Sequence, residues 1–125
     1  MEIFGIGTDI IEIDRIKKAA EKGRFLEKIF TEAEREYFRK RNMKAESIAG
    51  TFAAKEAVSK SVGTGIREFS FCDIEILRDE NGRPFVNPKK GLKDFCEKMN
   101  ICEIKVSISH SREYAVANAM ALTRE

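Results

Sequence analysis

Two carboxylates in this sequence could together bind a metal ion. Asp9 follows a short segment in which Gly5 and Gly7 leave one strand face bare, so that another backbone or a ligand can approach closely. Glu56 lies in the alanine-rich segment 52–60, FAAKEAVSK, where an unpaired buried charge would be strongly destabilising. Mg²⁺ commonly takes one or two carboxylates together with waters and phosphate oxygens. Zinc is disfavoured because the sequence holds a single histidine.

Both carboxylates also have a purely structural interpretation. Asp9 could cap the N-terminus of a helix, with Glu12 completing a capping box. Glu56 could form an i,i+4 ion pair with Lys60, which stabilises an exposed helix by about 0.2–0.5 kcal/mol. Lys55 could equally lie on the surface or face a ligand. The residue types alone therefore leave metal binding and helix stabilisation open.

A glycine-containing loop and the only histidine are further candidates. Gly63, Thr64 and Gly65 follow the alanine-rich segment, where they could turn backbone N–H groups toward an anion or simply end a helix. His110 closes the pattern VSISH and is followed by Ser111. A serine nucleophile paired with this histidine is disfavoured, because no Gly-x-Ser-x-Gly elbow surrounds these serines. Binding and structural roles for His110 both remain open.

The elements that must position these residues divide the chain into two halves. Helical periodicity and capping signals dominate the first half, after a strand whose one face would carry Ile3, Gly5, Gly7 and Asp9. The elements expected there are a strand over 2–8 and helices over about 10–22, from Thr31 to about 41, and over about 45–61. Alternating patterns dominate the second half. The elements expected there are a hairpin of 69–79 and 83–87 around 80–82, a helix over 89–100, and strands over 102–111 and 113–122. This order favours an α+β fold, with helices mainly in the N-terminal half packed on a mostly antiparallel β-sheet.

Length and composition limit the classes of protein to which this chain can belong. A chain of 125 residues predicts a single domain over 1–125. Its 23 basic and 21 acidic residues give a net charge of +2, too small to argue for nucleic acid binding. No apolar run reaches the roughly 18 residues of a membrane span, and no signal peptide is expected. Three irregularly spaced cysteines, Cys72, Cys96 and Cys102, predict reduced core thiols and a cytoplasmic location.

Three segments together resemble the holo-[acyl-carrier-protein] synthase family of 4′-phosphopantetheinyl transferases. They are GIGTDIIEIDRI near the N-terminus, FAAKEAVSKSVGTGI in mid-chain and VSISHSREYAVANA near the C-terminus. Their order and spacing are those of the family, so the resemblance covers essentially the whole chain. It implies the 4′-phosphopantetheinyl transferase fold. It also implies Mg²⁺-dependent transfer of 4′-phosphopantetheine from coenzyme A to a serine of apo acyl carrier protein, in fatty acid biosynthesis, with release of adenosine 3′,5′-bisphosphate.

The resemblance also implies roles for individual residues. Asp9 and Glu56 would be the metal ligands and, with Lys60 facing the coenzyme's phosphates, the catalytic set. The residues expected to bind the coenzyme are Lys60, Gly63, Thr64 and Gly65, with His110 and Ser111 near its 3′-phosphate. The residues expected to dock the acidic carrier protein are Arg15, Arg24 and Lys28. The proton acceptor stays open among Asp9, Glu56 and a water on the metal.

The resemblance further implies a homotrimer with sites at the subunit interfaces, the His110 region coming from a neighbouring subunit. The chain departs from the family at Thr51, where an arginine is frequent, and around Lys44, where basic residues are fewer. Some contacts to the coenzyme's phosphates are therefore expected to differ.

Two alternatives to transfer compete with this interpretation. One is a coenzyme A- or nucleotide-binding module without transfer activity. The other is a small basic RNA-binding protein, which would need a concentrated basic patch with exposed aromatic residues. Here the basic residues are interleaved with acidic ones and there is no Trp.

Overall fold

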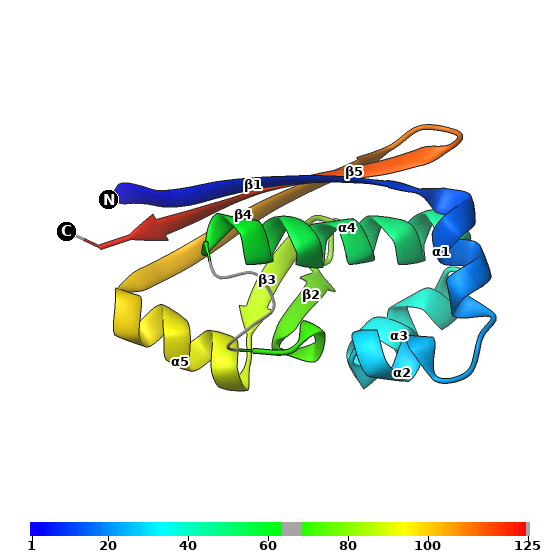
Figure 1. The fold of residues 1–125 in the computed structure, drawn as a ribbon, viewed down its shortest axis with the longest axis horizontal. Coiled ribbons are helices and arrows are strands. Elements are labelled where there is room, and N and C mark those ends of the chain that lie inside the picture. The colour runs from blue at the N-terminus through cyan, green and yellow to red at the C-terminus, as the bar shows by residue number, and fades with distance from the viewer. Residues whose placement is uncertain (64–68, 125) are drawn as a thin grey trace.

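The computed structural model describes residues 1–63 and 69–124. Figure 1 shows its order of elements along the chain. In that order they are β1 (Glu2–Glu12), α1 (Ile13–Ala20), α2 (Phe25–Ile29), α3 (Glu32–Lys40), α4 (Ala45–Ser61), the short 3₁₀ helix η1 (Phe71–Asp73), β2 (Ile74–Arg78), β3 (Pro84–Pro88), α5 (Lys90–Met99), β4 (Ile101–His110) and β5 (Tyr114–Thr123). The α+β class is confirmed, with α1–α4 in the N-terminal half.

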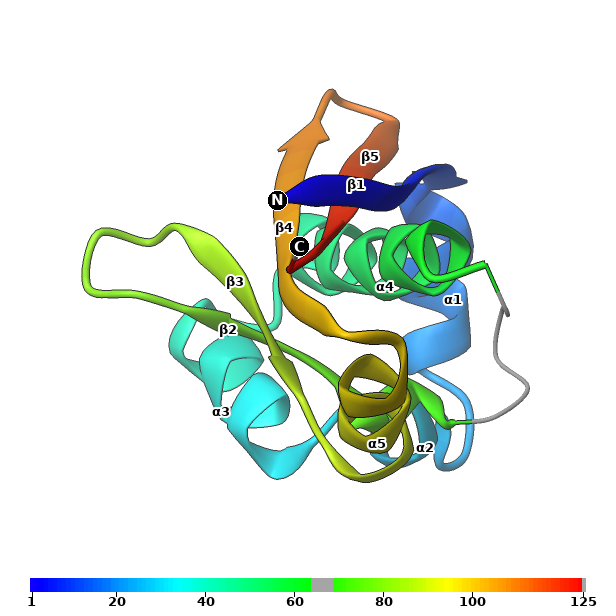
Figure 2. The ribbon, with the colours of Figure 1, turned by 90° about the vertical axis from the view of Figure 1, so that its left-hand side faces the viewer.

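The strands form two antiparallel sheets rather than one. A three-stranded sheet has the order β1–β5–β4, and a separate two-stranded sheet pairs β2 with β3. The long helix α4 runs along one face of the three-stranded sheet, and the β2–β3 hairpin, α2 and α3 lie on the other side of α4 (Figures 1 and 2). The helix is therefore enclosed from two sides.

Helix α4 can be enclosed because its side chains are small. Ala49, Ala53, Ala54 and Ala57 are fully buried, as is Val58. They join two apolar clusters, one shared with the sheets and α5, the other with α1–α3. The expected helix over 45–61 is thus confirmed with its bounds, and burial around most of its girth explains its composition. No helix in the described residues has the length and apolar character that a membrane crossing requires.

Strand β1 packs directly on the backbone of α4. A Cβ atom at Gly5 would lie 2.2 Å from the Ser61 carbonyl oxygen, and one at Gly7 would lie 2.0 Å from that of Ala57. Only glycine allows this contact, as the bare face of the strand suggested. Ile3 does not share that face, because the register shifts between Ile3 and Gly5 and leaves the Ile3 side chain 61% exposed.

The strand also extends further than predicted. Glu12 still pairs with Tyr114 of β5, so α1 begins at Ile13 rather than near residue 10. Asp9 pairs with Ala117 in mid-strand. The interpretation of Asp9 as a helix cap is therefore wrong, because pairing with a distant strand continues past it.

Candidate functional site

Asp9 and Lys60 meet where β1 crosses α4. The Lys60 ammonium donates to the Asp9 Oδ1 atom at 3.2 Å and to the Thr8 carbonyl oxygen at 2.9 Å. The close approach at Gly7 brings the two elements together at this point. The Asp9 side chain is 17% exposed and that of Lys60 is 53% exposed. The carboxylate is thus recessed while the ammonium remains open to a ligand.

Glu56 lies one turn before Lys60 on the same helix. Burial raises the pKa of its carboxyl, the negative charge of Asp9 raises it further, and the Lys60 ammonium lowers it. Because the charge of Asp9 raises this pKa, the two carboxylates are near enough to repel each other. Within residues 1–63 and 69–124, no hydrogen bond or ion pair engages the Glu56 carboxylate. The i,i+4 pair with Lys60, the structural alternative for Glu56, is not formed, because Lys60 bonds to β1 instead.

This pair of carboxylates fits a hard divalent cation. In the described part of the chain no group of three or more His, Cys, Asp or Glu side chains gathers to hold a metal. Zinc sites take three or four such protein ligands. Mg²⁺ needs only one or two carboxylates, with water and phosphate oxygens completing its shell. Asp9 and the unbonded Glu56 supply that minimum.

Gly63 ends α4. Its φ angle is +81° and its N–H donates to the Lys60 carbonyl oxygen at 3.1 Å, which supports the helix-stop interpretation. Thr64 and Gly65 lie outside the described residues.

His110 and Ser111 lie at the tip of the β4–β5 hairpin. The Ser111 N–H donates to the Tyr114 carbonyl oxygen at 2.8 Å, and Ser111 Oγ accepts from the Tyr114 N–H at 3.3 Å, which closes the turn. His110 is exposed and pairs with Ala115. Since β5 lies between β4 and β1, the structure does not bring His110 to Asp9 within one chain.

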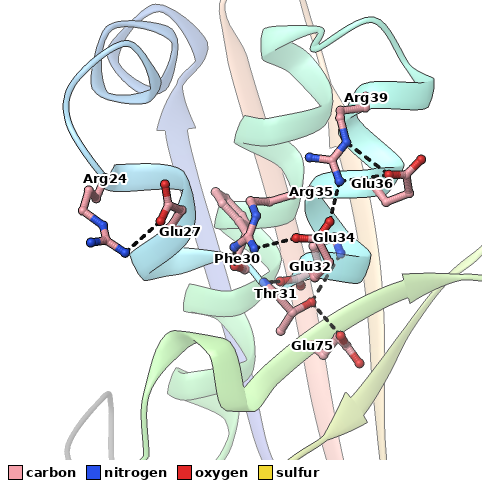
Figure 3. Close-up of polar contacts among 10 residues, drawn as sticks. All are labelled: Arg24, Glu27, Phe30, Thr31, Glu32, Glu34, Arg35, Glu36, Arg39 and Glu75. Atoms are coloured by element: carbon pink, nitrogen blue, oxygen red, sulfur yellow. Dashed lines mark hydrogen bonds and ion pairs between the residues drawn. The ribbon is translucent and has the colours of Figure 1, made fainter.

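The three cations expected to dock a carrier are exposed on α1 and around α2. Arg15 lies in the first half of α1. Arg24 forms an ion pair with Glu27 at 2.9 Å (Figure 3), so part of its charge is already compensated. Lys28 is exposed near the end of α2. Helices α1 and α2 lie at the same end of the molecule (Figure 1).

Lys55 is neither on the surface nor directed at the site. Its side chain is fully buried and its ammonium lies 2.8 Å from Glu34 Oε1. Both expectations for this residue are wrong, because position 55 faces α3 and β2 rather than β1. No local pattern pairs Lys55 with Glu34, twenty-one positions earlier in the chain.

Two further contacts could not be predicted from the sequence. The Thr8 carbonyl holds Lys60 through its backbone, which no side-chain pattern reveals. Thr51 is buried and accepts a hydrogen bond from Arg78 Nη2 of β2 at 3.1 Å. This is the position where the family that the sequence resembles frequently has an arginine. A guanidinium therefore reaches position 51 from another element.

Comparisons with known proteins give one consistent match. A family model described as the 4′-phosphopantetheinyl transferase superfamily matches residues 5–119. A holo-[acyl-carrier-protein] synthase of Thermoanaerobacter sp. is 50% identical over 126 residues, covering 100% of this chain and 91% of the relative. The solved structure of holo-[acyl-carrier-protein] synthase from Neisseria meningitidis has a TM-score of 0.89 at 34% identity, covering 98% of this chain and 100% of that one. The Helicobacter pylori synthase in complex with coenzyme A has a TM-score of 0.82 at 36% identity, covering 94% and 99%.

Proposed function

Since this chain belongs to the holo-[acyl-carrier-protein] synthase family of the 4′-phosphopantetheinyl transferase superfamily, we propose that it transfers 4′-phosphopantetheine from coenzyme A to a serine of apo acyl carrier protein. The serine hydroxyl gives its proton to an acceptor in the site, from which it passes to solvent, and its oxygen bonds to the β-phosphorus of coenzyme A. The bond from that phosphorus to the bridging oxygen breaks, and adenosine 3′,5′-bisphosphate leaves with that oxygen. The observation that carries this proposal is the gathering of Asp9, Glu56 and Lys60 where β1 crosses α4.

In this proposal Asp9 and Glu56 hold Mg²⁺. The recessed Asp9 carboxylate and the unbonded Glu56 carboxylate supply oxygen ligands from two elements whose contact is fixed by glycines. When bound, Mg²⁺ supplies positive charge that stabilises the pyrophosphate oxygens.

Lys60 binds and orients the phosphates of coenzyme A. Its anchoring bonds to Asp9 and Thr8 set where the ammonium lies, and its exposure leaves it open to a ligand. Charge-assisted bonds from such an ammonium stabilise the negative charge spread over the phosphoryl oxygens during transfer. Gly63, Thr64 and Gly65 are assigned to the coenzyme in the same proposal.

We further propose that residues 1–125 act as one domain that assembles into a homotrimer, with sites shared between subunits. Support comes from the outer face of the three-stranded sheet, where Ile3, Ile6 and Ile10 are 61%, 68% and 64% exposed. Large exposed apolar side chains gathered on one strand mark an interaction surface. In the trimer, His110 and Ser111 bind the 3′-phosphate of a coenzyme held mainly by the neighbouring subunit.

The carrier protein docks, in this proposal, against Arg15, Arg24 and Lys28. Their exposure at one end of the molecule suits an acidic partner, because complementary charge speeds encounter. The pathway served would be cytoplasmic fatty acid biosynthesis.

The test is intact-mass spectrometry of apo acyl carrier protein incubated with this protein, coenzyme A and Mg²⁺, beside a chelator control. We expect a metal-dependent gain of one phosphopantetheine unit and equimolar release of adenosine 3′,5′-bisphosphate. Coenzyme A binding without any gain on several carrier proteins would favour the binding-module alternative. RNA binding that weakens steeply with salt, again without gain, would favour the nucleic-acid alternative.

A further inference from the structure

The ammonium of Lys55 makes all its polar contacts inside the protein. It lies 2.8 Å from Glu34 Oε1 and donates to the carbonyl oxygens of Phe71 and Ile74, each at 2.8 Å. An ammonium has three protons, so these three acceptors satisfy it completely. The Phe30 ring covers it, with the nitrogen 5.5 Å from the ring centroid. These contacts therefore hold the Lys55 side chain in a single position.

Glu34 is held just as fully. Its Oε1 atom accepts from the Thr31 N–H at 2.8 Å as well as from Lys55, and its Oε2 atom accepts from the Ile76 N–H at 2.7 Å. Figure 3 shows Glu34 beside Thr31 at the start of α3. One ion pair thus joins α3, α4, η1 and β2 at a single point.

Such a pair is a poor source of net stability. Desolvating two charges offsets much of their attraction, and apolar residues of similar size often stabilise a core equally well. The pair does restrict geometry, because each partner is satisfied only in this arrangement.

Lys55 is the chain neighbour of Glu56. Successive helical residues project about 100° apart, so the direction of one side chain fixes the direction of the next. On the opposite side, α4 rests on the backbone of Gly5 and Gly7. The glycine contacts set the distance between helix and strand. The directional bonds of Lys55 add a constraint from the other side of the helix, against rotation about its axis.

We propose that the Lys55–Glu34 ion pair fixes the rotation of α4 and thereby positions Glu56 to bind a metal ion together with Asp9. Lys55 is then a positioning residue that never touches the substrate. The inference rests on the proposed function, since it takes Glu56 as a metal ligand.

The test compares Mn²⁺ affinity with stability in four variants. Free Mn²⁺ is followed by electron paramagnetic resonance at a fixed concentration of coenzyme A, and unfolding midpoints are measured separately. The variants are Lys55→Met, the double variant Glu34→Gln/Lys55→Met, Glu56→Gln and the control Lys89→Met. Lys89 is a matched control because it also pairs with a buried carboxylate, Glu75 of β2 at 3.5 Å, but it lies just before α5 rather than on α4.

We expect Lys55→Met to weaken Mn²⁺ binding by about 10-fold, as lost support of a metal ligand does. Lys89→Met should stay within about twofold of wild type, since a side chain outside α4 does not set the rotation of that helix. Lys55→Met leaves the buried Glu34 carboxylate without its partner, and the double variant removes that charge. The unfolding midpoint of the double variant should therefore exceed that of Lys55→Met, while Mn²⁺ binding stays weak. This separation of stability from affinity distinguishes positioning from a merely structural role.

The inference is overturned if Lys55→Met binds Mn²⁺ like wild type, or if the double variant recovers stability and affinity together. If Lys55→Met fails to fold, the Mn²⁺ affinity of the double variant alone tests the inference. Wild-type affinity no higher than that of Glu56→Gln would overturn the metal assignment itself, a result distinguishable from failure of the positioning role.

Discussion

Lys60 and Asp9 form an ion pair that contributes little to stability. Pairs with an exposed partner typically contribute about 0–1 kcal/mol, and the Lys60 side chain is 53% exposed. The pair instead fixes a cation beside a recessed carboxylate. Activity should therefore depend on Lys60 far more than folding does.

Replacing Lys60 with Met tests this difference. Loss of one charge-stabilising donor costs about 10²–10³-fold in rate, so we expect transfer to fall at least 100-fold by that estimate. The free energy of unfolding should change by less than about 1 kcal/mol. Transfer rates are measured by intact mass and stability by urea unfolding. Arg39→Met, which breaks exposed pairs with Glu32 and Glu36, is the control and should keep its activity.

At the scale of elements, the contact between β1 and α4 creates the site. Gly7→Ala would place a methyl group 2.0 Å from the Ala57 carbonyl oxygen, so the strand must move away from the helix. Overpacking of this kind costs about 1–3 kcal/mol. We expect that loss in urea unfolding, together with reduced transfer because Asp9 moves from Lys60. Thr8→Ala, which removes an exposed bond to Asn118, should change stability by at most about 0.5 kcal/mol. Equal stability of Gly7→Ala and wild type would refute the close contact.

Local signals predicted the elements whose ends are set locally. Thr31 caps α3 and forms a capping box with Glu34, and α4 has its predicted bounds. The end of β1 and the partner of Lys60 were missed, because both depend on segments far along the chain. Helix α2 was also missed; it is only one short turn and a half, with no buried residue to mark a period. The sequence predicted that Asp9, Glu56 and Lys60 act together, but it did not predict the bonds by which Lys60 is held to β1.

The cysteines give an element-scale prediction about burial. Cys96 lies on α5, and its burial in the core shared with the strands raises the pKa of its thiol to about 11. Because the thiolate is the reactive form, Cys96 should resist iodoacetamide at pH 8, while half-buried Cys72 and Cys102 react first. Peptide mapping of the native protein measures the order, and the urea-unfolded chain serves as the control with three equal rates. Fast modification of Cys96 in the native state would show that its site opens readily.

At the scale of the whole molecule, the exposed face of the three-stranded sheet is the feature to explain. We expect Ile6→Lys to dissociate the homotrimer, because a charge would replace the middle one of the three exposed isoleucines of β1. Light scattering should give a monomer, and transfer should fall because each site would lose the neighbour's His110. Met99→Lys changes an exposed apolar residue on α5 and should remain trimeric. An active monomer of either the wild type or Ile6→Lys would contradict shared sites.

The most direct test of the central claim is the transfer rate of Glu56→Gln, measured by intact mass of the carrier protein against wild type. The amide keeps the shape of Glu56 but loses the charge that would hold Mg²⁺, so transfer should fall by at least about 100-fold. Glu46→Gln, an exposed carboxylate in the first turn of the same helix, should retain the wild-type rate. A Glu56→Gln protein that modifies its carrier at the wild-type rate would contradict a metal-dependent site built on Asp9 and Glu56.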